Sequence, residues 1–66
     1  MDEILILTAD EQIEVYNAIK TLLIRKHKVT LISIAMLTNI PMAHLYEGLD
    51  DVIIILERVS ENLKVR

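Results

Sequence analysis

The middle of the chain constrains the fold more than any other part of its 66 residues. Apolar residues recur there at the spacing of a helix face, first over residues 30–38 and again over residues 41–52. Thr30 is a typical N-cap for the first segment, and Pro41 fits the first turn of the second because it needs no amide partner there. Asn39, between them, tolerates the left-handed backbone of a tight turn. The sequence therefore predicts two short helices joined by a sharp turn.

The side chains of this region predict how the two helices pack. Ala35 is small, as required where two helices cross closely. Ile34 and Leu45 fill the angle between the helices, and Ile40 closes the turn. The second helix of this pair is thereby attached to the domain through its inner residues, and its outer residues are left exposed.

Residues 34–41 contain the pattern Ile-Ala-x-x-Thr-x-Ile-Pro, which resembles helix-turn-helix DNA-binding domains. The pattern is similar to that of winged-helix regulators of the IclR and MarR kind, in which the recognition helix leads into a β-hairpin wing. The pair Leu45-Tyr46 is similar to that of tetracycline-repressor-like proteins, in which the tyrosine usually contacts the DNA backbone. The resemblance covers about residues 8–66. It implies a small transcription regulator that binds double-stranded DNA as a homodimer, of the size found in phages, plasmids and archaeal viruses.

The resemblance places the DNA contacts on the second helix of this pair and on the basic residues around it. The groove-facing candidates are Thr30, Met42, His44 and Tyr46. The candidates for phosphate contacts are Lys26, Lys28, Arg58, Lys64 and Arg66. The outer face departs from both families because it carries Glu47, Asp50 and Asp51, and the DNA backbone repels carboxylates. DNA binding is therefore expected to be weak for one copy and to improve with dimerisation.

The tail, residues 53–66, has two interpretations. Its β-branched start favours a strand, and Ser60-Glu61-Asn62 has the composition of a hairpin turn, so the tail is a β-hairpin wing. In the alternative the tail is a fourth helix, because apolar residues recur at helical spacing at Val52, Ile55, Leu56, Val59 and Leu63. We favour the hairpin, which would place Arg58, Lys64 and Arg66 on one face.

The remaining segments complete one domain over residues 1–66. Thr8 and Glu11 have the spacing of a capping box, which predicts a first helix over residues 9–26. The predicted fold class is α+β, a small winged helix-turn-helix of three helices and a hairpin, with a possible strand at the N-terminus. The predicted segments are helices at 9–26, 30–38 and 41–52 and a wing at 53–66. The alternative is an all-α helix-turn-helix with a fourth C-terminal helix.

The apolar content, 53% of the residues, exceeds what so short a chain can bury in its own core. The excess lies in the N-terminal arm and at the start of the tail, and predicts a surface for a second copy. The candidate dimer interface consists of Ile4, Leu5, Ile6, Leu7, Ile53, Ile54 and Ile55. As an alternative function, this apolar surface and the acidic helix at 41–52 would bind another protein, in an anti-regulator or a subunit of a larger complex.

Several classes are excluded by composition. The chain has no Cys, one Gly and two distant His, so we expect no disulfide, no metal site, no phosphate-binding loop and no cofactor. No nucleophile stands beside a base, which predicts that the protein is not an enzyme. The net charge of −3 differs from that of a strongly basic, non-specific nucleic-acid binder. The apolar runs are too short for a membrane span, so we expect a cytoplasmic protein with no membrane partner and no small-molecule effector domain.

Overall fold

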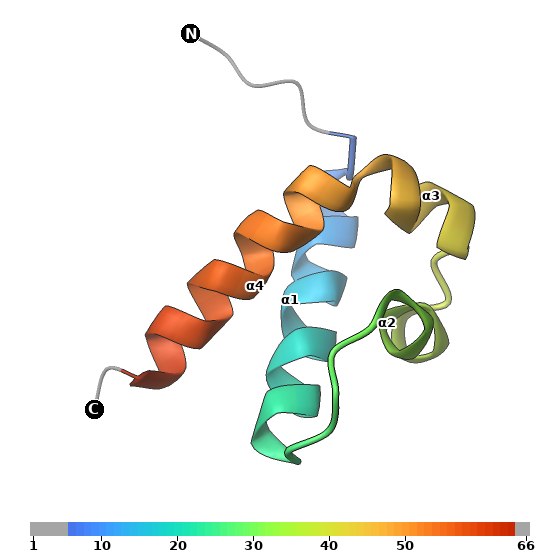
Figure 1. Cartoon of the computed structure of the whole chain (residues 1–66). Helices are drawn as coiled ribbons and strands as arrows, with labels where there is room; N and C mark the ends of the chain where they lie inside the picture. Colours follow the sequence, from blue (N-terminus) through green and yellow to red (C-terminus); the bar gives the residue numbers. More distant parts are fainter. Residues whose placement is uncertain (1–5, 65–66) are drawn as a thin grey trace, which may run out of the picture.

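The structure is a computed structural model that describes residues 6–64, and this part of the chain consists of four α-helices without a strand (Figure 1). The helices are α1 (Ala9–Ile24), α2 (Leu31–Thr38), α3 (Met42–Glu47) and α4 (Leu49–Lys64). α1 packs against both α2 and α4, and α3 packs against α2 and the start of α4. None of the four is long and apolar enough to cross a membrane.

The predicted α+β fold with a β-hairpin wing is wrong, because α4 is helical through Lys64 and includes the predicted hairpin turn. The all-helical alternative, with a fourth helix in the tail, is the arrangement seen over residues 53–64. Helical spacing places Val52, Ile55 and Val59 together, where all three are buried. Burial of one such side chain contributes about 1.5–3 kcal/mol, whereas a β-branched residue costs only about 0.5 kcal/mol of helix propensity. Packing against α1 therefore outweighs the local preference for strand.

The possible N-terminal strand falls largely outside the described residues, and residues 6 and 7 are not part of a strand. Their backbone N–H groups instead donate to one carboxylate oxygen, Asp51 Oδ2, at 2.8 Å from Ile6 and 3.0 Å from Leu7. Asp51 is only 6% exposed, so these two bonds supply the partners that a buried carboxylate requires. The segment before α1 is thereby attached to the first turn of α4.

α1 begins where the capping box predicts. Glu11 N–H donates to Thr8 Oγ1, and Thr8 N–H donates to Glu11 Oε1 at 2.9 Å. The helix ends at Ile24, two residues before the predicted end, because Lys26 adopts the left-handed region with φ 62°. The positive φ reverses the chain direction and leads it toward α2.

The turn between α2 and α3 is built from local hydrogen bonds. Thr30 caps α2, with its Oγ1 accepting from Ser33 N–H at 3.1 Å. At the other end Asn39 is left-handed, with φ 66°, and its N–H donates to Ala35 O at 2.8 Å. Ile40 N–H donates to Thr38 Oγ1 at 3.2 Å, and the Ile40 side chain is buried. This is the sharp turn that the sequence predicts.

The helix expected over residues 41–52 is divided at Gly48 into α3 and the first turn of α4. Gly48 is buried beneath the N-terminal segment, and a Cβ placed on it would lie 3.1 Å from Leu7 Cγ and 3.3 Å from Ile6 Cβ. The break thus lets the chain before α1 approach the helix backbone closely, which only glycine permits without a shift.

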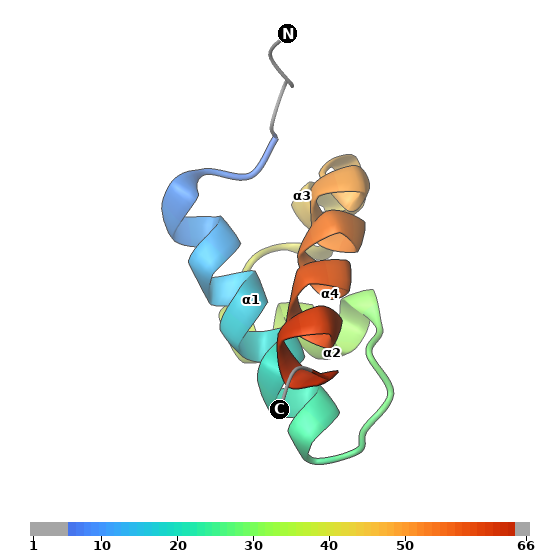
Figure 2. The same cartoon turned by 90° about the vertical axis from the view of Figure 1, so that its left-hand side faces the viewer.

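α1 and α4 run in the same direction, so both helices begin at the end of the molecule near α3 (Figures 1 and 2). Both begin with acidic residues, Asp10 and Glu11 in α1 and Asp50 and Asp51 in α4. Cations follow their opposite ends, with Arg25, Lys26 and Lys28 after α1 and Lys64 in the last turn of α4. Among the described residues, the charges at the ends of α1 and α4 are therefore divided between an acidic end and a basic end.

Candidate nucleic-acid interface

α3 is fixed by one buried side chain and presents the others outward. Leu45 is fully buried in the common core, together with Ile34 from α2 and Val15 and Ile19 from α1. Met42 and Tyr46, one turn apart, are 45% and 69% exposed, and Ala43 between them is also exposed. α3 therefore has an outer face that is free to contact a partner, and Met42 and Tyr46 lie together on it.

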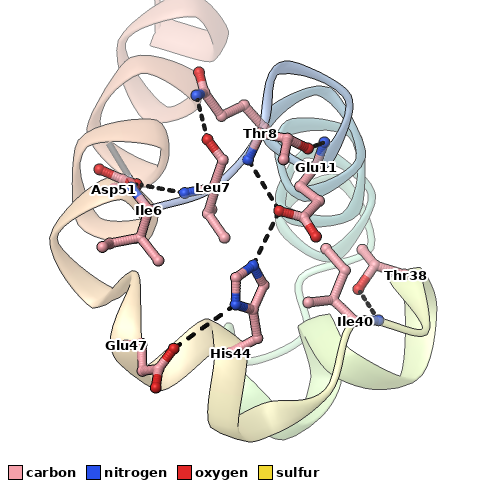
Figure 3. Close-up of polar contacts among 10 residues, drawn as sticks. Ile6, Leu7, Thr8, Glu11, Thr38, Ile40, His44, Glu47 and Asp51 are labelled. Carbon is pink, nitrogen blue, oxygen red and sulfur yellow. Dashed lines mark hydrogen bonds and ion pairs between the residues drawn. The ribbon is translucent and has the colours of Figure 1, made fainter. Parts of the chain in front are cut away.

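His44 is directed toward α1 rather than toward this outer face (Figure 3). Its Nε2 lies 3.0 Å from Glu11 Oε1, and its Nδ1 lies 3.9 Å from Glu47 Oε1. The side chain is half-buried, and the contact joins residues 33 positions apart. His44, which the sequence placed among the groove candidates, thus connects α3 to the first turn of α1.

The Glu11 carboxylate makes several favourable contacts where the start of α1 meets α3. The backbone N–H of Thr8 contributes most, followed by the His44 ring, and together they hold the pKa of Glu11 below its ordinary value of 4.5. The capping box identifies Glu11 in the sequence, but no local signal links it to His44. A single carboxylate therefore fixes both the start of α1 and the position of α3.

The candidates near α2 lie at its exposed N-terminal end. Thr30 is exposed, and its hydroxyl also donates to Ser33 Oγ at 2.9 Å. Lys26 and Lys28 are exposed in the loop that leads to Thr30. α2 packs against α3, but the loop with Lys26 and Lys28 follows the end of α1 that is far from α3 (Figure 1).

The cations of the tail are placed elsewhere. Arg58 borders a hollow between α1 and α4, lined also by Ile13, Tyr16 and Ile55. Lys64 is at the end of α4 that is far from α3 (Figures 1 and 2). Arg66 lies outside the described residues. The hairpin that would have brought these cations beside the recognition helix is replaced by α4.

The surface of α2 and α3 is apolar rather than basic. Neither helix contains Lys or Arg, and Glu47 is the acidic residue on them. Besides Met42 and Tyr46 of α3, this surface includes the exposed side chains of Ile32, Met36 and Leu37 of α2. Periodicity alone could not separate the inner from the outer face of α2, because nearly every position of its sequence LISIAMLT is apolar.

The candidate dimer interface divides into buried and exposed residues. Leu7 and Ile55 belong to the core of the chain itself, with 2% and 8% exposure. Ile6, Ile53 and Ile54 are exposed. Ile4 and Leu5 lie outside the described residues.

The described residues contain no group of three or more acidic or His side chains placed to hold a metal ion. Three shallow hollows lie along the seams of α1 with α2 and α4.

No protein-family model matches this chain, and no curated protein or solved structure matches it at a significant level.

Proposed function

We propose that this domain is a helix-turn-helix module that binds double-stranded DNA, with α3 as the helix that enters the major groove. The proposal rests on one observation, the outer face of α3, which is held rigidly by Leu45 and by the His44–Glu11 contact. α2, the left-handed Asn39 and α3 supply the helix, tight turn and helix of this motif. Because the winged families need a hairpin, the supporting resemblance is the tetracycline-repressor-like one, carried by Leu45 and Tyr46.

The proposed contacts follow from the chemistry of the exposed side chains. The Tyr46 hydroxyl would donate to a phosphate of the DNA backbone. Met42 and Ala43 offer apolar surface that fits the thymine methyl group in the major groove. Lys28 and Thr30 stand at the start of α2, where free backbone N–H groups also favour a phosphate. Recognition of bases would therefore depend on apolar contacts, while the phosphate contacts would fix the position of α3 on the DNA.

The available charge limits the strength of this binding. The loop before α2 supplies two cations per copy, Lys26 and Lys28. Neutralising about two phosphates per copy gives a slope of log K against log salt of about −2, or about −4 for a dimer. Raising the salt from about 50 to about 200 mM should therefore lower the affinity about 16-fold for one copy and about 250-fold for a dimer.

The test is fluorescence anisotropy of a labelled duplex of random sequence, titrated with protein at several salt concentrations. Lys28→Ala should reduce the slope by about one unit per copy. Tyr46→Phe should weaken binding while leaving the slope nearly unchanged, because a neutral hydroxyl releases no counterion. Lys20→Ala is the matched control, since Lys20 is an exposed lysine of α1 outside the proposed interface. No binding by the wild-type chain at about 50 mM salt would refute the proposal.

A second candidate function, docking of another protein on α2 and α3, is favoured by the composition of this surface. It has five exposed large apolar side chains and lacks Lys and Arg. Such a patch is typical of protein interfaces, which have apolar centres with few charges. The test compares proteins captured from cell extract by the wild-type chain, by Met36→Lys and by the control Ile24→Lys, at an exposed isoleucine of α1. A partner retained by the control and lost with Met36→Lys supports docking on this face. Equal capture by all three contradicts it.

A further inference from the structure

We propose that the outer face of α4 binds a second copy of this chain, through antiparallel pairing of the stripe formed by Asp50, Ile54 and Arg58. This inference does not depend on DNA binding, because it concerns a different face of the molecule.

The stripe is exposed along the length of α4. Asp50, Ile54 and Arg58 recur every four residues, so they lie along one side of the helix. The buried side is instead formed by Val52, Ile55 and Val59. Asp50 and Arg58 are both exposed, and Ile54 retains 36% of its surface. α4 thus buries one side in its own domain and leaves this side available.

The two charges of the stripe lack a partner within the described part of the chain. The ion pairs found over residues 6–64 are those of His44 with Glu11 and Glu47, and neither involves Asp50 or Arg58. No side-chain hydrogen bond of these residues is found there either. Their charges are therefore free to be matched by a second molecule.

The surroundings of the stripe on the α1 side are apolar. Ile13 of α1 is 59% exposed, and it lines the same hollow as Arg58 and Ile55. Ile6 is 42% exposed and is attached to the start of α4 through Asp51 (Figure 3). A second α4 seated on the stripe would cover Ile54 and reach toward these two isoleucines. Exposed apolar side chains therefore lie near both ends of the stripe, Ile13 beside Arg58 and Ile6 beside the first turn of α4.

The order of residues in the stripe makes it complementary to itself. Asp50 and Arg58 stand four residues, about 6 Å along the helix axis, on either side of Ile54. In a symmetric antiparallel pair with its twofold axis at Ile54, Asp50 faces Arg58 of the partner subunit, and Arg58 faces Asp50 of the partner subunit. The two copies of Ile54 then pack together between two ion pairs. A parallel pair would bring like charges together.

This property distinguishes α4 from the other exposed apolar surface. α2 exposes Ile32, Met36 and Leu37 without any charged residue in the helix, so nothing there specifies an orientation for a second copy. On α4 the apolar residue is flanked by charges of opposite sign at equal distance. Charge complementarity of this kind selects partner and register.

The experiment is sedimentation equilibrium of the 66-residue chain in the absence of DNA, so that its outcome is separate from that of the DNA titration. The wild-type chain should be a reversible dimer. Ile54→Lys should raise the dimer dissociation constant by about tenfold or more, because it places two like charges at the twofold axis. Ile32→Lys, a change of the same kind at an exposed isoleucine of α2, should leave it unchanged. Circular dichroism of each variant verifies that the helices are intact.

Charge exchange tests the antiparallel register itself. Asp50→Arg alone and Arg58→Asp alone should each raise the dissociation constant about tenfold, since each creates two like-charge contacts. The double variant restores both pairs with reversed sign and should return to within about threefold of the wild-type value. A wild-type monomer at all concentrations, an unaffected Ile54→Lys dimer, or a double variant no better than the single ones would overturn the proposal.

Discussion

Asp51 is expected to contribute more to stability than any other charged residue of the described chain. Its carboxylate is buried, and Oδ2 accepts from both Ile6 N–H and Leu7 N–H. Replacement by alanine leaves these two N–H groups without a protein partner. The change therefore tests whether one side chain holds the N-terminal segment against α4.

The magnitude follows from the burial of the two donors. Leu7 N–H is buried, so its loss of an acceptor should cost about 1–3 kcal/mol. Ile6 N–H is partly buried and accessible to water, so its loss should cost about 0.5–1.5 kcal/mol. Asp51→Ala is expected to lower the free energy of unfolding by about 1.5–4.5 kcal/mol in total. For a domain of this size that corresponds to a fall in Tm of about 10–30 °C.

The assay is urea unfolding followed by circular dichroism at one protein concentration. Asp51→Asn keeps an oxygen acceptor and loses the charge, so it should cost about 1 kcal/mol. Asp10→Ala is the matched control, because Asp10 is an exposed acid in the first turn of α1. It should cost no more than about 0.5–1 kcal/mol through the helix dipole. If Asp51→Ala and Asp10→Ala unfold at the same urea concentration, the reasoning from the two buried donors is refuted.

Three further predictions use the same unfolding measurement. Asn39→Ala should cost about 1 kcal/mol because alanine is disfavoured in the left-handed region, whereas Asn39→Gly should be nearly neutral, and equal effects would contradict the turn described here. Gly48→Ala should cost about 1–3 kcal/mol, since the new Cβ would lie 3.1 Å from Leu7 Cγ, and an unchanged midpoint would show that the segment above it shifts freely. The lowered pKa of Glu11 means that its contribution is present above 4.5, the ordinary value, and is lost as the pH falls through the lower value of the folded state. Glu11→Gln should therefore lose less stability below pH 4.5 than the wild-type chain, and identical pH profiles would refute this assignment.

The elements that depend on local sequence signals could be predicted without the structure. The Thr8–Glu11 capping box and the left-handed Asn39 both depend on neighbouring residues, and both are present. The conformation of the tail could not be predicted in this way. β-branched residues at its start favour strand locally, while the advantage of helix comes from burying Val52, Ile55 and Val59 against α1, which is distant in sequence.

The candidate site could be predicted only where residues close together in the sequence form it. Met42 and Tyr46 are four residues apart, so helical spacing places them on one face as soon as α3 is assigned. The direction of His44 depends on Glu11, 33 residues earlier, and the position of Arg58 depends on whether the tail is helix or hairpin. Both needed the tertiary arrangement, for which the sequence has no signal.

The common direction of α1 and α4 makes the molecule an electric dipole. Four carboxylates at the helix starts outweigh the partial positive charges of two helix N-termini, about half a charge each. Four cations at the other end outweigh the corresponding negative ends in the same way. A polyanion thus exerts a torque that turns residues 25–30 toward it before contact. If α3 enters the groove as proposed, it arrives second, by rotation about that first contact, and the acidic end of the molecule opposes its approach. Added salt would then slow the encounter and ease the rotation that follows it.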